Sequence, residues 1–278
     1  MNSLATQQRS FYCHLPSWLV GVISAALLLH GPIAQLPHYH EFADQSVWCG
    51  LSHAADVLSN GGFALVALWG MWRLWPVRTH PAIKAGWCAY RLFLVSLFLT
   101  AFGSGFYHLA PDNARLLWDR LPIALAFAGL LAAVRAETVV TASIDTVRQR
   151  RDVIGFVMFA VISVAWWFFT DRQGAGDLRF YLLLQGLPLI LIPLWQTLYG
   201  AASADRIAFA AALAVYVLAK LAEIHDHELA HALHAISGHT LKHLLATLAA
   251  AILVRRLVMR TRVLANAGSS ATSATSVF

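Results

Sequence analysis

The sequence predicts an all-α fold, a polytopic membrane helix bundle with a seven-helix core and one extra N-terminal transmembrane helix. Of its 278 residues, 59% are hydrophobic and 12% are charged, about half the charged share of a typical soluble domain. Apolar runs recur at about 20 residues, the length that a helix needs to cross about 30 Å of hydrocarbon. These observations indicate a bilayer as the solvent and argue against a cytosolic enzyme.

The apolar runs are predicted to be helices because a backbone in lipid must satisfy its own hydrogen bonds, and because strand-type alternation is absent. No soluble domain fits between them. In chain order, the eight runs are residues 17–36, 55–75, 87–109, 117–134, 153–170, 178–198, 207–221 and 239–254.

The positions of Lys and Arg predict the orientation of the chain across the membrane, because cytoplasmic loops of membrane proteins carry an excess of these residues. Every second connection is basic, whereas the alternate ones are poor in cations or balanced by acids. This pattern predicts eight crossings with both termini cytoplasmic. The cations lie in or beside the connection after the second run (Arg73, Arg78, Lys84, Arg91), the fourth (Arg135, Arg148, Arg150, Arg151) and the sixth (Arg206), and in the tail after the eighth (Arg255, Arg256, Arg260, Arg262).

The first run has two interpretations. A cation, Arg9, precedes an apolar stretch that ends at Pro32, as in a signal peptide. We favour a retained helix because no convincing small-residue cleavage site follows. The chain then divides into an N-terminal segment (1–37), a seven-helix core (38–257) and a disordered cytoplasmic tail (258–278) rich in Ser, Thr and Ala.

Charge and cysteine content argue against other classes. Lys and Arg number 20 against 14 Asp and Glu, but these cations sit at the edges of apolar runs rather than on the polar face that a nucleic-acid binder presents. The three cysteines, Cys13, Cys49 and Cys88, are too few and too scattered for a disulfide framework or a cysteine zinc site.

Histidine is the unusual residue, with 13 in the chain and six between His225 and His243. His239 and His243 are spaced i, i+4, so they share one helix face and can bind one metal ion. That spacing alone also suits a packing pair or a haem. However, the predicted topology places His108 and Asp119 at the same outer depth. Three histidines with an open position make the ligand set of a catalytic zinc, and a nearby carboxylate can move protons.

Two motifs carry a family resemblance. The stretch GSGFYHLAPDNARLLWDRLP (103–122), together with SGHTLKHLLA (237–246), resembles the alkaline ceramidase family, particularly its bacterial branch. That family belongs to a superfamily of seven-helix membrane hydrolases shared with the progestin and adipoQ receptors. The resemblance extends from about residue 43 to about residue 253.

The resemblance implies an enzyme, a zinc-dependent hydrolase of linear amides that acts on ceramide-like sphingolipids, with zinc-activated water attacking the amide carbonyl. His108, His239 and His243 would bind zinc, Asp119 would transfer the proton, and Ser104 would donate a hydrogen bond. It also implies a bacterial inner membrane, with the site on the periplasmic side and a membrane lipid as the partner.

The sequence departs from the family before its core. Animal members carry an acidic calcium-binding segment, whereas residues 41–60 contain only Glu41, Asp44 and Asp56, which weakens the expectation of calcium. Asp56, Ser59 and Asn60 resemble the family segment, but we favour a role as hydrogen bonders at a helix end. The extra first helix is a second departure.

Several residues keep two interpretations. Lys220 and Glu223 form either an ion pair facing the bundle or a pair at the membrane interface. Four histidines are favoured as solvated loop residues over a second metal site. Arg115 and Arg120 are expected to be exposed at the outer rim, where they attract a lipid phosphate or anchor the interface. The four histidines are His225, His227, His231 and His234.

Two further classes of function compete with hydrolysis. One is a lipid-sensing, receptor-like membrane protein with a structural zinc ion. The other is a transporter or haem protein that uses the paired histidines, although the internal repeats typical of transporters are not evident. The sequence makes no prediction of oligomeric state.

Overall fold

A computed structural model describes residues 2–138, 146–174 and 176–274, and most of this part of the chain is helical. Its strands form one two-stranded antiparallel hairpin, β1 (Val47–Trp48) with β2 (Leu51–Ser52). The helices are α1 (Asn2–His30), α2 (Ala54–Ser59), α3 (Gly61–Leu74), α4 (Pro81–Lys84), α5 (Trp87–Leu109), α6 (Asn113–Thr138), α7 (Thr146–Arg172), α8 (Arg179–Leu198), α9 (Ser203–Ile224), α10 (Asp226–Leu233) and α11 (Gly238–Ala274).

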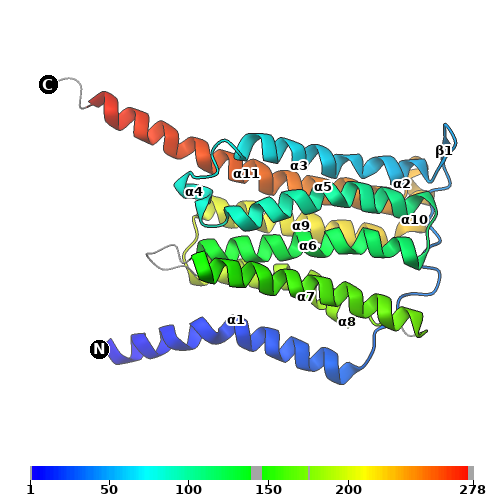
Figure 1. The fold of residues 1–278 in the computed structure, drawn as a ribbon, viewed down its shortest axis with the longest axis horizontal. Helices are drawn as coiled ribbons and strands as arrows, with labels where there is room; N and C mark the ends of the chain where they lie inside the picture. The colour runs from blue at the N-terminus through cyan, green and yellow to red at the C-terminus, as the bar shows by residue number, and fades with distance from the viewer. Residues whose placement is uncertain (1, 139–145, 175, 275–278) are drawn as a thin grey trace.

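The long helices lie side by side in one bundle, and α1 begins on the side where α11 ends (Figure 1). Six spans are long and apolar enough to cross a membrane, counting α2 and α3 as one and then α5 to α9. Many large apolar side chains are exposed on these helices, as expected of a surface that faces lipid. The protein is therefore an all-α, multi-pass membrane protein.

The expected count of eight crossings goes beyond these six. The first run falls in α1, whose apolar stretch His14–His30 is shorter than the others. The eighth run forms the first part of α11, where polar residues lie at both ends. His239, Lys242 and His243 interrupt the apolar sequence at one end, and Arg255 and Arg256 follow it at the other. α11 then continues as a helix to Ala274, through most of the range for which we expected disorder.

α6 is the central helix, because it packs against α5, α7 and α8 and is the most buried span. Alanines and Gly129 line its buried faces, and small residues let membrane helices approach closely. α5 comes closest at Gly103, where an added Cβ would lie 2.1 Å from the carbonyl oxygen of Trp118. This carbonyl also lacks the usual helix hydrogen bond, because Pro122, four residues later in α6, has no N–H to donate to it. Only glycine fits at this contact, which sets α5 and α6 together beside Ser104 and Asp119.

The N-terminal helix α1 packs against α8, and a carboxylate joins the segment after α1 to the beginning of α8. Asp177, whose side chain is 2% exposed, accepts hydrogen bonds from the Ile33 amide (3.2 Å) and the Trp166 indole (2.9 Å). It also pairs with Arg179 at 2.7 Å. The Ile33 carbonyl in turn accepts from the amide of Leu178. This network fixes the segment after α1 to the beginning of α8.

We expect Asp177→Asn to loosen this junction. Burial by itself raises the pKa of Asp177, but hydrogen bonds from Arg179, Trp166 and the Ile33 amide outweigh it and lower the pKa to about 2. A lowered folded-state pKa means that the carboxylate stabilises the fold above its ordinary value of 3.8, and that this stability is lost as the pH falls toward 2. The variant should lose about 2 kcal/mol at pH 7 and progressively less below pH 4.

Thermal unfolding in detergent across this pH range measures the effect. Asp112→Asn is the matched control, because Asp112 is half exposed and its ion pair with Arg115 is long (3.7 Å). Its other contact, a hydrogen bond accepted from the Arg115 amide (2.7 Å), can be kept by the side-chain oxygen of asparagine. An equal loss in both variants, or a loss at pH 7 that persists unchanged at pH 3, would contradict the assignment.

Candidate metal centre

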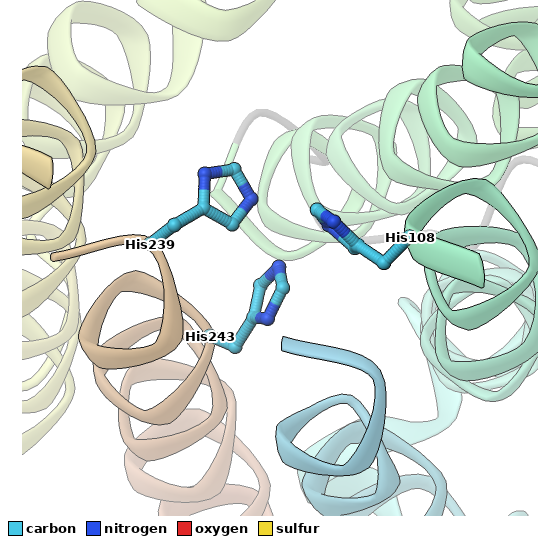
Figure 2. A group of neighbouring side chains, drawn as sticks. All are labelled: His108, His239 and His243. Carbon is cyan, nitrogen blue, oxygen red and sulfur yellow. The ribbon is translucent and has the colours of Figure 1, made fainter. Parts of the chain in front are cut away.

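Three histidines converge at the end of the bundle where α5 ends and α11 begins. One nitrogen from each of His108, His239 and His243 lies within 4.8 Å of the others, and Figure 2 shows the rings turned toward one another. The ring centroids are 4.7–5.1 Å apart. The residues are 0%, 4% and 2% exposed, in that order. The structure thus brings together the three residues that the sequence predicts as metal ligands.

Capping of α11 fixes the positions of His239 and His243. The first amides of a helix have no partner within it. The Ser237 hydroxyl accepts the amide of Thr240 (2.9 Å), and the Asp226 carboxylate accepts the amide of His239 (2.7 Å). Gly238 lies against the backbone of α9, since an added Cβ would be 2.2 Å from the Ala222 carbonyl. Glycine at this position therefore lets α11 start beside α9 and α10.

A phenylalanine covers the histidines. The Phe42 ring lies edge-on to the rings of His108 (4.7 Å) and His239 (4.4 Å). The next residue, Ala43, donates its amide to Asp226 at 2.9 Å. The same carboxylate thus positions both α11 and the segment that shields the histidines from water.

The nitrogen atoms of this group suit a metal ion. Both ring nitrogens of His108 and Nε2 of His243 are buried, and none has a hydrogen-bond partner among the residues that the structure describes. Buried polar atoms are normally paired, so these atoms lack a ligand. Imidazole nitrogen suits zinc, copper, iron and nickel. We conclude that the residues fit a transition metal ion.

His243 has the outer partner that a metal-binding histidine usually needs. Its Nδ1 lies 2.9 Å from the hydroxyl of Ser59. That hydroxyl donates its proton to the carbonyl of Asp56 (3.0 Å), so His243 Nδ1 is the donor in the first contact. The assignment leaves the Nε2 lone pair free for a metal. Ser59 thus makes the helix-end hydrogen bond that the sequence predicts and, in addition, an unpredicted contact with His243, which depends on α2 packing against α11.

Lys242 contacts the histidine group directly. Its ammonium donates to His239 Nε2 (2.9 Å) and to Glu223 Oε1 (2.8 Å), and Lys220 pairs with the same glutamate. Of the two interpretations of Lys220 and Glu223, the structure therefore supports the ion pair facing the bundle, and the pair has a third member. If Nε2 of His239 binds the metal ion, the Lys242 ammonium can no longer donate to it and has to rotate away. Glu223 can still pair with the Lys242 ammonium after this rotation.

Ser104 and Asp119 face the same space as His243. All three line a cavity of about 150 Å³ inside the bundle. Ser104 lies near the Asp119 carboxylate, whose Oδ1 has no partner in the described part of the chain. The rest of the wall is mainly apolar, with residues such as Phe93, Leu97 and Leu253. The cavity wall thus combines a buried carboxylate, a hydroxyl and the imidazole of His243 with mainly apolar side chains.

The acidic residues before α3 serve the fold. Asp56 accepts from the hydroxyls of Thr240 (2.5 Å) and Ser237 (3.3 Å), which ties α2 to α11. Asp44 accepts the amides of Ser46 and Asp56. Burial by itself raises the pKa of Asp44, but these hydrogen bonds outweigh it and lower the pKa. Both oxygens of Asp44 are thus already used, and Glu41 pairs with His38.

Two other predictions have clear outcomes. In the described ranges, the histidine triad is the one close group of three possible metal ligands, whereas His225, His227, His231 and His234 are exposed. The favoured interpretation of these four as solvated residues is confirmed, although two lie in α10 rather than a loop. The expectation that Arg120 is exposed is wrong, because it is 3% exposed. Its helix, α6, has neighbours on most sides.

No protein-family model matches the chain, and no curated protein matches it with significant similarity. The resemblance to alkaline ceramidases therefore stays a prediction that depends on the two motifs.

We predict that Ser59→Ala weakens metal binding without removing any ligand. Loss of the outer hydrogen bond leaves the His243 ring free to rotate and makes its nitrogen less basic, so zinc affinity should fall about 10- to 100-fold. Competition with a chromophoric chelator in detergent measures the affinity. Ser52→Ala, on the exposed hairpin, should bind zinc like the parent. Equal affinities in all three proteins would show that Ser59 does not orient His243.

Proposed function

We propose that this protein is an integral-membrane, zinc-dependent hydrolase of linear amides that acts on ceramide-like lipids. One observation carries the proposal. Three buried histidines converge, two of them with unpartnered ring nitrogens, and one of these, His243, lines an apolar cavity together with Ser104 and Asp119. The family resemblance of the two motifs gives the substrate class.

His108, His239 and His243 would hold the ion. Zinc bound by three neutral imidazoles supplies Lewis acidity and an activated water. Asp119 accepts a proton from the attacking water and later delivers it to the departing amine nitrogen. Ser104 donates a hydrogen bond to the oxygen on which negative charge develops. The apolar wall binds the acyl chain and excludes bulk water.

In the same proposal, the chain crosses a bacterial inner membrane eight times. The seven-helix core (38–257) follows the extra helix, and both termini are cytoplasmic. The support is the alternation of basic connections and the bundle geometry, in which α1 begins and α11 ends on one side (Figure 1). The site then faces the periplasm, at the opposite end from the basic connections.

A second candidate function is a lipid-sensing, receptor-like protein with structural zinc. The burial of all three imidazoles, two of them against Phe42, favours it, because a structural zinc site is closed, whereas a catalytic one keeps an open position. This candidate predicts tight lipid binding without turnover.

Metal analysis of the detergent-purified protein is the first test. We expect about one zinc ion per chain, because three imidazoles converge on one point. His239→Ala should lose most of this zinc, whereas His231→Ala, which changes an exposed histidine of α10, should keep it. A parent protein without stoichiometric zinc would contradict both candidate functions.

Asp119→Asn separates the two candidates. The variant should retain zinc, because Asp119 is not a ligand, and should hydrolyse fluorescent ceramide at least about 100-fold more slowly, because it cannot accept the proton. Asp112→Asn, which changes an exposed carboxylate near the start of the same helix, should keep full activity. If the parent binds lipid amides tightly but cleaves none of a broad panel, the receptor-like function stands and the hydrolase is excluded.

A further inference from the structure

Arg120 is a buried cation that forms no ion pair within the residues that the structure describes. Its Nη2 donates to the side-chain oxygen of Gln35 (2.8 Å). Its Nε and Nη1 are buried, and in the part of the chain that the structure describes neither has a hydrogen-bond partner. A buried charge is costly unless it is paired and hydrogen-bonded. The orphaned donors therefore point to a group that the chain itself does not supply.

Three aromatic rings hold the guanidinium in place. Its carbon lies 4.0 Å from the ring centroid of Trp167, 5.2 Å from that of Tyr39 and 5.3 Å from that of Tyr181. These contacts stabilise the cation through the ring faces and use none of its N–H groups. Arg120, Tyr39 and Tyr181 all line the internal cavity, so a cavity ligand can reach the free donors.

The charges around the cavity also favour an anion. Three cations and two carboxylates line it, which leaves one positive charge. Glu223 already pairs with both lysines, and no ion pair joins Asp119 to Arg120 within the described ranges. The cations are Arg120, Lys220 and Lys242, and the carboxylates are Asp119 and Glu223.

We propose that Arg120 binds an acidic group in the head of the lipid amide. The inference rests on the proposed function and narrows its substrate class to N-acyl lipids whose amine part carries a carboxylate or a phosphate. An arginine suits both groups because its planar donors match their oxygens. Asp119 and Arg120 are consecutive and line one cavity, so the amide can lie beside the first while the head group contacts the second.

Binding of a short probe at pH 7.5 tests this without turnover. The probe is N-dodecanoylglycine, and its neutral methyl ester is the matched ligand. Affinities are measured by tryptophan fluorescence in detergent, on full-length protein carrying Asp119→Asn to prevent hydrolysis. We expect the acid to bind at least about tenfold more tightly than the ester, the effect of one good charge-assisted contact. Adding Arg120→Gln should reduce the preference to less than twofold.

Arg115→Gln is the matched control, because this arginine lies on the same helix but outside the cavity, and it should keep the full preference. Gln35→Glu covers the case in which Arg120→Gln does not fold. It leaves Arg120 and its rings unchanged and places a carboxylate at the existing 2.8 Å contact. We expect this internal anion to abolish the preference for the acid.

Equal binding of acid and ester by the parent would overturn the proposal, as would a preference that survives in Arg120→Gln or in Gln35→Glu. A second pair of probes, dodecanoic acid and dodecanol, distinguishes a carboxylate in the head group from the carboxylate of a released fatty acid. A preference seen only with this second pair would assign Arg120 to the released fatty acid and overturn the head-group assignment. Hydrolysis of neutral ceramide together with equal binding would remove this inference alone and leave the proposed hydrolase intact.

Discussion

The carboxylate of Asp226 holds the histidine end of the bundle together. It accepts one amide from the segment before α2, at Ala43, and one from the first turn of α11, at His239. Hydrogen bonds to a carboxylate are about twice as strong as neutral ones. The carboxylate is itself buried, so water cannot replace either amide. One side chain of α10 thus sets both the direction in which α11 enters the bundle and the position of Phe42 over the histidines.

A second constraint is that polar groups in a membrane bundle have to find partners inside the protein. At the histidine end, most of them do. Asp56 Oδ1 accepts from Thr240 and Ser237, and Glu223 pairs with two lysines. Unpartnered buried atoms remain on His108, His243, Asp119 and Arg120, and also on Asp56 and Asn60. Among these, the imidazole nitrogens and the guanidinium are the groups that a metal ion and an anionic ligand would complete.

Much of the fold could be predicted from the sequence, because a bilayer makes length and hydropathy sufficient to find a helix. The third run, 87–109, has the bounds of α5, and the sixth, 178–198, differs from α8 by one residue. The histidine site could also be predicted, since the i, i+4 pair lies on one helix and the cation pattern placed His108 at the same end. Neither inference required knowledge of which helices pack together.

What failed depended on packing. Arg120 follows Asp119 at the start of a hydrophobic run, and a cation there normally faces the interface. The sequence does not reveal that α6 is the central helix, with Trp167 of α7 and Tyr181 of α8 beside it. The role of Ser59 depends similarly on α2 contacting α11. The continuation of α11 to Ala274 was missed because Ser and Thr outweighed the alanines, which are the strongest helix formers.

The two proposed ligands of the cavity are coupled by charge. A divalent ion at the histidines would lie near Lys242, which already donates to His239, so positive charge would accumulate where the chain supplies two carboxylates for three cations. An anion bound by Arg120 would offset part of that charge across a cavity of low dielectric, where such interactions are strong. Because coupling between sites is reciprocal, metal and acidic head group should each favour the binding of the other. A neutral head group has no charge to offset that of the metal ion, so its binding would not be coupled to metal binding. The coupling therefore depends on Arg120 rather than on the three histidines.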